Sequence, residues 1–388
     1  MRSAAPALRE NGDRAMPRRL IALFDGTWSK VQTRTNVERF WKLIAPSDPS
    51  GVEQICKYVP GVGVEPGIEH LLGGAFGLGL SGNVEDGYKW LSEQWRDGDE
   101  IWLFGFSRGA YTARSLGGLI RKCGLLKPDA KGSVTGAAVD EAYGYYRNDD
   151  KPGVLVNGAD PTALWRAQHG VREVTIRFIG VWDTVGSLGI PGVASWFPFS
   201  RKRYAFHDTD LSRIVQYAYQ ALALDEHRAD FRPTKWTRPK DARAPSESPT
   251  AWKPEQVEVE QRWFAGAHSD IGGGEKTDGA GHSPDTLPEI TLAWMQAKAK
   301  GAGLAFSDDF VLTPGAELDV PNDSYAQFMY GIYKVFSKLY ERQIGGGINE
   351  TIDSSVWMKW YAQSVYRPQP IEIAMQGDLI DLGSSRVA

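Results

Sequence analysis

The chain has 388 residues, of which 42% are hydrophobic, and it carries 43 glycines and a formal net charge of −4. No block of basic residues is present, which argues against nucleic-acid binding. No apolar run is long enough to span a bilayer, and the first nineteen residues lack the apolar core of a secretory signal. Cys56 and Cys123 have no neighbouring cysteine, so we interpret both as buried thiols in a reducing compartment. The expected location is therefore the cytoplasm of the producing cell.

The first third of the chain alternates between predicted strands and predicted helices. Residues 1–17 are interpreted as a mobile leader, because they are polar and basic. Apolar runs predict strands at 19–24, 54–59 and 100–106, and apolar residues at helical spacing predict helices at about 36–45, 83–95 and 108–123. The segment 61–82 holds eight glycines, too many for an ordinary element, so we expect it to be an inserted loop.

The same alternation continues through the middle of the chain. Further predicted strands are VTIRFIGVW (174–182) and EVEQRWFAGA (258–267), and further predicted helices are 211–224 and 288–300. Other candidate insertions are about 128–170, 232–256 and the tail after about 305. No internal repeat or linker divides the chain, so we expect one catalytic domain at 18–305 and a helical extension, 306–388, packed on it.

Strands that are apolar on both faces and alternate with helices predict an α/β fold. Its central sheet is expected to be mostly parallel, with helices on both faces. In such sheets the binding and catalytic sites lie at the carboxyl ends of the strands. The residues that follow each predicted strand are therefore the candidates for function.

The strand at 100–106 ends in Gly105-Phe-Ser107-Arg-Gly109, which is a G-x-S-x-G motif. This motif places serine on a strained turn between a strand and a helix, with its hydroxyl exposed. The turn crowds the positions two before and two after the serine, which explains glycine at both. The motif alone is weak, but the strand before it and the helix after it favour Ser107 as a nucleophile. The alternative is a glycine-rich turn that only packs tightly.

A serine nucleophile requires a base, and the base requires an acid that orients it. The chain order expected for this fold is serine, then aspartate or glutamate, then histidine. Asp183 follows the strand at 174–182, and His268 follows the strand at 258–267. His70, His169, His207 and His227 lie in less suitable positions, and His282, in a loop, is the one serious rival to His268.

The oxyanion of an acyl-transfer reaction needs two backbone N–H donors. One is expected from Arg108, directly after the nucleophile. The other is expected from the turn Asp25-Gly26-Thr27, where glycine allows close approach of the substrate, although an ordinary turn is an equal alternative. Asp270 offers a different alternative, in which it joins His268 and Asp183 or Asp25 around a hard metal ion. No recognised metal-ligand spacing is present, so we predict neither a metal nor a cofactor.

A glycine pattern earlier in the chain, Gly77-Leu-Gly79-Leu-Ser-Gly82, matches the dinucleotide-binding motif G-x-G-x-x-G. It does not directly follow a convincing strand, and no acidic residue ends a second strand about twenty residues later. We therefore reject dinucleotide binding.

Six motifs occur in order along residues 19–300 and resemble a known family. They are LFDGTW, TNV (35–37), GFSRGAYTAR (105–114), GVWDTVG (180–186), ALALDEHR (221–228) and FAGAHSDIGGG (264–274). Together they resemble uncharacterised-domain family 2235, which includes the Tle1-like type VI secretion phospholipase effectors. The resemblance implies an α/β-hydrolase with a Ser-Asp-His triad, carried over here onto Ser107, Asp183 and His268. It also implies cleavage of phospholipid esters. The chain departs from the family by lacking an evident membrane-anchoring module after the catalytic domain.

Two apolar segments bear on the substrate. Trp196, Phe197 and Phe199 precede the basic run 201–203, a combination that suits a lipid headgroup interface or, equally, packing onto the domain. The segment 325–340 has an apolar stripe that favours core or cap packing over membrane contact.

We therefore expect a serine ester hydrolase of phospholipase or lipase type. The alternatives are a carboxylesterase for a soluble ester and a catalytically idle binding or toxin-associated module. The expected partners are a lipid or other acyl-ester substrate and a membrane surface that the protein contacts peripherally. Delivery to another cell is compatible with the resemblance, but the residues identify neither a delivery partner nor an immunity partner.

Overall fold

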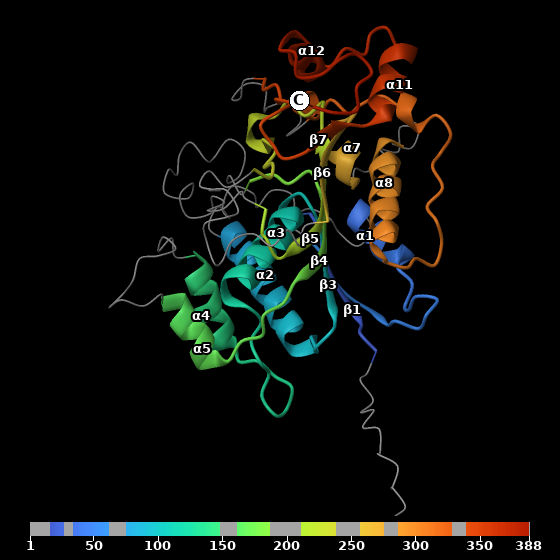
Figure 1. Cartoon of the computed structure of the whole chain (residues 1–388). Helices are drawn as coiled ribbons and strands as arrows, with labels where there is room; N and C mark the ends of the chain where they lie inside the picture. The colour runs from blue at the N-terminus through green and yellow to red at the C-terminus, as the bar shows by residue number, and fades with distance from the viewer. Residues whose placement is uncertain are drawn as a thin grey trace, which may run out of the picture.

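A seven-stranded parallel sheet forms the centre of the protein (Figure 1). The computed structural model describes residues 16–26, 34–61, 75–147, 161–186, 211–237, 257–274, 286–327 and 339–387. The strand order is β2-β1-β3-β4-β5-β6-β7, and each neighbouring pair is parallel. The strands are β1 (Arg19–Phe24), β2 (Gln54–Val59), β3 (Glu100–Phe106), β4 (Ile176–Trp182), β5 (Val215–Ala223), β6 (Glu258–Phe264) and β7 (Glu350–Ile352). The predicted α/β fold with a parallel sheet is thereby confirmed.

Helices cover both faces of this sheet. One face is covered by α2 (Ala75–Gln94), α3 (Arg108–Cys123), α4 (Gly136–Arg147) and α5 (Pro161–His169). The other is covered by α1 (Asn36–Leu43), α7 (His268–Gly272) and α8 (Leu287–Ala302), and the short α9 (Ser324–Gln327) follows α8 in the chain. At the β7 edge lie α11 (Ser354–Ala362) and α12 (Gln369–Gln376) (Figure 1). Every described helix is too short or too polar to cross a bilayer.

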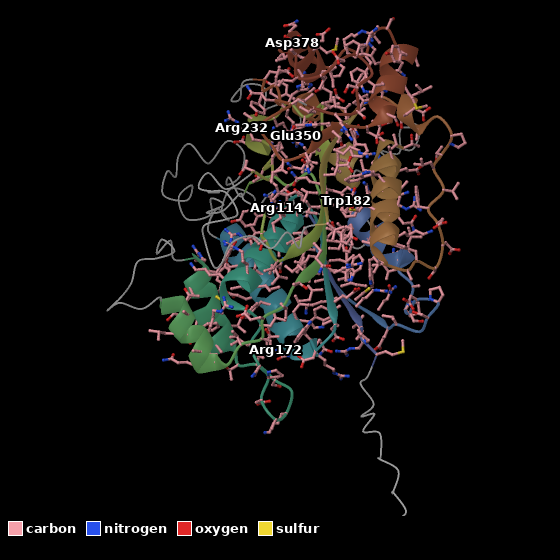
Figure 2. The ribbon with its side chains drawn as sticks, viewed as in Figure 1. Arg114, Arg172, Trp182, Arg232, Glu350 and Asp378 are labelled. Carbon is pink, nitrogen blue, oxygen red and sulfur yellow. The ribbon has the colours of Figure 1, made fainter. Side chains whose placement is uncertain are left out.

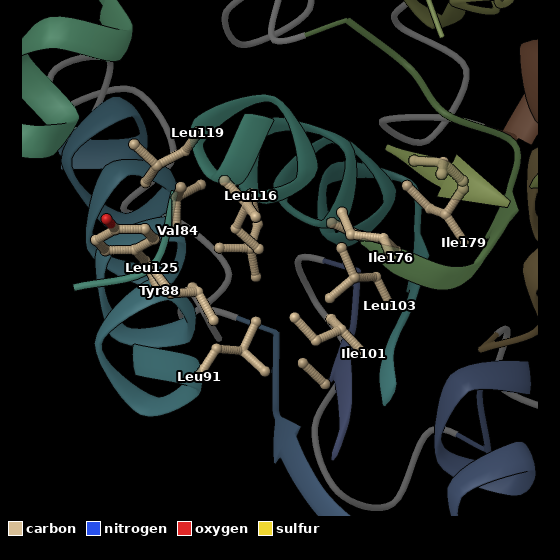
Figure 3. Close-up of a cluster of buried hydrophobic side chains, with 14 of the residues drawn as sticks. Val84, Tyr88, Leu91, Ile101, Leu103, Leu116, Leu119, Leu125, Ile176 and Ile179 are labelled. Carbon is tan, nitrogen blue, oxygen red and sulfur yellow. The ribbon is translucent and has the colours of Figure 1, made fainter. Parts of the chain in front are cut away.

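The period of two along each central strand divides its side chains between the two helical layers. In β3, Ile101 and Leu103 face the α2–α3 layer, while Trp102 and Phe104 face the α1–α8 layer, and all four are fully buried. Figure 3 shows the first of these layers, where side chains of α2 and α3 point toward Ile101 and Leu103. Burial on both faces explains why these strands are continuous apolar runs.

Three elements differ from the sequence-based expectation. The segment 211–224, predicted to be a helix, forms β5, with Tyr217, Tyr219, Ala221 and Ala223 alternating toward one face. Alanine and leucine suit either structure locally, but hydrogen bonding to β4 and β6 on both sides makes this segment a strand. The helix predicted at 83–95 begins eight residues earlier, so the end of the glycine-rich segment is helical. The candidate insertion 128–170 contributes α4 and α5 to the layer beside α3.

The chain after residue 305 contains helices and also supplies β7. This strand pairs with β6 over Gln261–Trp263, and α11 and α12 bury the tryptophans of a third cluster against the same edge. The segment therefore shares the central sheet. The boundary at residue 305 stays a prediction, and most of the leader, 1–15, and most of the predicted stripe at 325–340 lie outside the described residues.

Candidate active site

Ser107 lies on a sharp turn between the end of β3 and the start of α3. Its backbone is strained, with φ 56° and ψ −118°, and its amide donates a hydrogen bond of 3.0 Å to the carbonyl of Trp182 on β4. A Cβ at Gly105 would lie 2.3 Å from the carbonyl oxygen of Gly109, and a Cβ at Gly109 would lie 2.0 Å from that of Phe24. The turn can therefore form only with glycine at both positions, as the motif predicted.

Three predicted residues from three strand ends are hydrogen-bonded in series. Ser107 Oγ lies 2.8 Å from His268 Nε2, and His268 Nδ1 lies 2.6 Å from Asp183 Oδ2. Asp183 is fully buried, while Ser107 and His268 retain 8% and 6% of their surface exposed. The structure thus brings together a hydroxyl, an imidazole and a carboxylate in the arrangement that the predicted nucleophile, base and orienting acid would need.

The acid and the base are each fixed by backbone contacts. Asp183 sits at the end of β4 with φ 38°, its amide donates to the carbonyl of Ala221, and its Oδ1 accepts from the amide of Ala223 at 3.1 Å. His268 begins α7, and its amide donates to Glu226 Oε2 at 3.2 Å. The imidazole packs against Phe106 and Phe231, with ring centroids 4.7 and 5.1 Å away. These contacts hold the imidazole between Ser107 and Asp183.

Asp270 serves the turn that carries His268. Its carboxylate accepts hydrogen bonds from the amides of Ala267 and Asn322, each at 2.8 Å, and a Cβ at Gly266 would collide with it. These are capping contacts at the start of α7. No group of three or more metal-binding side chains occurs within the described ranges.

Arg342 contacts Asp183 from a distant part of the chain, and no local motif marks this arginine. Its Nη1 donates to Asp183 Oδ1 at 2.6 Å and its Nη2 donates to Asp183 Oδ2 at 2.9 Å. The guanidinium is fully buried and also donates to the carbonyls of Ala223 and Phe231. A buried carboxylate needs a cationic partner to offset its loss of hydration, but the residues around Asp183 do not indicate which cation supplies it.

The electrostatics favour an ionised Asp183 and a neutral His268. Burial alone would raise the pKa of Asp183, but the charge of Arg342 and the hydrogen bonds from His268 and Arg342 hold it far below its usual range. Burial lowers the pKa of His268, and the hydrogen bond and charge of Asp183 only partly offset this. His268 is therefore neutral at pH 7 and able to accept the proton of Ser107.

The expected oxyanion donors lie beside the nucleophile. A Cβ at Gly26 would lie 3.5 Å from Ser107 Cβ, and Arg108 is the first residue of α3. The Gly26 amide, however, donates to the carboxylate of Asp25 at 2.6 Å, and the same carboxylate accepts from Thr35 and Tyr58. Both oxyanion assignments stay predictions. The Gly26 amide must release its hydrogen bond to Asp25 before it can donate to a substrate oxygen.

The remaining candidates either lie apart from this site or outside the described residues. His169 contacts the carbonyl of Trp165 on α5, and His227 pairs with Glu341 at 3.3 Å. The predicted residues Thr27, Trp196, Phe197 and Phe199, and the rival His282, lie outside the described ranges, as do His70 and His207.

A known family matches most of the chain. Residues 18–298 match the model of the T6SS phospholipase effector Tle1-like catalytic domain. The chain belongs to the Tle1-like family. The resemblance drawn from the six motifs is thereby confirmed. An uncharacterised protein of Saccharomyces cerevisiae, YEL023C, is 31% identical over 230 residues, which cover 55% of this chain and 32% of that protein.

Two solved structures are also similar to this Tle1-like chain. The Tle1 effector bound to the VgrG spike of the type 6 secretion system has 18% identity and a TM-score of 0.38, covering 73% of this chain and 57% of that one. An uncharacterised protein from Pseudomonas aeruginosa has 19% identity and a TM-score of 0.40, covering 78% and 48%. The chain thus spans about a third of the curated relative and about half of these two structures.

The Tle1-like match includes the three hydrogen-bonded residues but ends before Arg342. It also includes the motif ALALDEHR, whose Glu226 supports His268 and forms a bidentate pair with Arg228. Glu226 is fully buried, and it lies just after the end of β5. This location beside His268 became apparent only when residues 211–224 were seen to form a strand.

Proposed function

We propose that this Tle1-like chain is a serine ester hydrolase. Ser107 Oγ attacks the acyl carbonyl carbon while His268 Nε2 takes its proton, and Asp183 stabilises the resulting imidazolium. His268 then returns the proton to the leaving alcohol oxygen, which departs as the ester bond breaks. A water molecule, deprotonated by the same imidazole, releases the acid and regenerates Ser107. The observation that carries this proposal is the hydrogen-bonded series of 2.8 and 2.6 Å on a strained strand–helix turn.

The start of α3 can stabilise the negative charge that develops on the substrate's carbonyl oxygen during this reaction. The amide of Arg108 lies at the amino terminus of a sixteen-residue helix, where the helix dipole favours a negative charge. Gly26 supplies the second donor once its amide turns from Asp25 to the substrate oxygen. The family name supports a phospholipid or related lipid ester as the substrate and a type VI secretion system as the route to a target cell.

The hydrolase proposal is tested with p-nitrophenyl butyrate and a fluorophosphonate probe. We expect the wild-type protein to turn over the ester and to be labelled at Ser107, and Ser107→Ala to lose both activities while keeping its circular dichroism spectrum. Turnover that persists in Ser107→Ala would refute the assignment. Absence of labelling in the folded wild-type protein would favour the idle binding module instead.

The substrate class is tested by comparing monomeric and aggregated lipids. A phospholipase should release fatty acid faster once a short-chain phosphatidylcholine passes its critical micelle concentration, whereas a carboxylesterase for a soluble ester should not. The secretion route is tested by asking whether the tagged protein leaves the cell only when the secretion sheath is intact. Export without the sheath would contradict that part of the proposal.

A further inference from the structure

Arg342 reaches the acid of the triad from the part of the chain that follows the family match. It is 159 residues from Asp183 in the sequence, and both of its terminal nitrogens donate to the two oxygens of that carboxylate. Both side chains are fully excluded from solvent. A bidentate arginine is a stronger and more directional partner than a backbone amide, so it constrains both the position and the charge of Asp183.

The segment that carries Arg342 is fixed on both sides of this residue. Before it, the amide of Tyr340 donates to the carbonyl of His227 at 2.9 Å, and Leu339 forms an isolated bridge with Arg228. After it, Lys235 donates to the carbonyl of Gln343 at 3.0 Å. The guanidinium is thus held against the turn that follows β5, the same turn that supports His268.

The charges around His268 come from three separate parts of the chain. Asp183 follows β4, Glu226 and Arg228 follow β5, and Arg342 lies in the late segment. Glu226 and Arg228 pair with each other in bidentate fashion at 2.8 and 2.7 Å, and Tyr340 lies near Arg342. With His268 neutral, these two carboxylates and two guanidiniums sum to zero, and a proton on His268 gives this group of five side chains a net positive charge. Asp225 and Asp270 also lie close by, where their carboxylates accept from the amides of Gly266 and Ala267, and substitution of Arg342 leaves both in place.

Resting on the hydrolase proposed above, we propose that Arg342 is a positioning residue that keeps the Asp183–His268 pair free of an extra proton at neutral pH. Without Arg342, the pair would carry a net negative charge, and a proton would neutralise it. Removal of the arginine therefore makes the pair take up a proton at higher pH, whether that proton resides on the imidazole or on the carboxylate. Burial would raise the pKa of Asp183, but the charge of Arg342 is the largest effect that lowers it. The pKa of His268 is lowered mainly by burial and also by the charge of Arg228.

The expected shift follows from the loss of one unit charge near the pair. For a unit charge several ångströms from the pair and an effective dielectric constant of about 20, Coulomb's law corresponds to an upward shift on the order of one to two pH units. The other groups near His268 are unchanged by the substitution. A purely structural arginine would instead lower stability and rate at every pH and leave the midpoint where it is.

The test follows the His268 ¹³Cε1 resonance through a pH titration, with His268→Gln used to assign the signal. We expect the midpoint to rise by about one to two units in Arg342→Gln and to stay within about half a unit of the wild type in Arg342→Lys, which keeps the charge. The acid limb of kcat/KM for p-nitrophenyl butyrate should move by the same amount, with partial recovery of Arg342→Gln activity above the new midpoint.

Arg172→Gln is the matched control. Arg172 is an arginine that donates to the backbone carbonyls of Ser92, Trp95 and Leu126 before β4 begins, at the opposite end of that strand from Trp182 (Figure 2). Its removal should lower stability and leave the His268 midpoint unchanged.

The outcomes separate this inference from the hydrolase proposal. An unshifted His268 midpoint in folded Arg342→Gln would overturn the role of Arg342, whatever the activity. A shifted midpoint in a protein without esterase activity would support the role of Arg342 and refute the hydrolase proposal. If Arg342→Gln does not fold, Arg342→Lys decides, since a midpoint shift of more than a unit with the charge retained would contradict the charge argument.

Discussion

Gly109→Ala should disable the site without touching any of its reacting groups. A Cβ at this position would lie 2.0 Å from the carbonyl oxygen of Phe24 and 2.6 Å from that of Asp25, both on the backbone of the neighbouring strand and its turn. A relaxed carbon–oxygen contact is about 3.3 Å, so the start of α3 must move away from β1 by about 1.3 Å. Ser107 is two residues away on the same turn, and its hydrogen bond to His268 is only 2.8 Å long.

The expected cost has two parts. Overpacking against backbone that cannot rotate away should lower the free energy of unfolding by about 1–3 kcal/mol. A misplacement of about 1 Å at a reacting atom can lower the rate about 100-fold, so we expect a loss of that order in kcat for p-nitrophenyl butyrate. Urea unfolding and steady-state kinetics measure the two parts separately.

Gly117→Ala is the matched control on the same helix. A Cβ at Gly117 would lie 3.5 Å from Ile176 Cδ1 and 3.9 Å from Leu103 Cδ1, which are ordinary contacts. Alanine in a helix interior is favoured over glycine, so this variant should gain about 0.5–1 kcal/mol and keep its rate. Wild-type rate and stability in Gly109→Ala would refute the steric explanation of the G-x-S-x-G spacing.

Further predictions concern titration and burial. Because burial lowers the pKa of His268, the acid limb of wild-type kcat/KM should fall below 6.5, the ordinary imidazole value, and a limb at or above 6.5 would contradict the proposed environment. The pKa of Glu226 would be raised by burial, but hydrogen bonding and the charge of Arg228 lower it to about 2, so its stabilising contribution is complete above 4.5 and is lost as the pH falls toward 2. The destabilisation caused by Glu226→Gln in urea melts should therefore shrink across that interval; a constant difference would count against the ion pair. Burial raises the pKa of Cys56 and Cys123 to about 12. Cys123 is fully buried and should resist a thiol-specific disulfide reagent at pH 8 until urea is added, whereas Cys56 is half-buried and should react slowly. Rapid labelling of the native protein would show that these sites are open.

The sequence alone predicted the features that depend on local chemistry. The strand before Ser107, the two glycines around it and the helix after it are dictated by the steric demands of one turn, and these demands are visible within ten residues. Asp183 and His268 were predicted because the carboxyl ends of parallel strands meet at one edge of a sheet, so chain order and position after a strand favoured them over the other candidates. The six motifs likewise identified the family because they are short, ordered and separately readable.

Only the tertiary structure decided the features that depend on distant partners. Residues 211–224 are compatible with a helix or a strand on their own, and pairing with β4 and β6 decides between them. No motif marks Arg342. The buried carboxylate of Asp183 needs only a cation within reach, and many sequence positions could supply one. The last residues of the glycine-rich segment begin α2, although glycine has a low helix propensity. The packing of α2 against α3 stabilises this helix. The steric demands of a turn depend on neighbouring residues, so they can be predicted from the sequence. Charge compensation and strand pairing depend on residues that only the folded chain brings together.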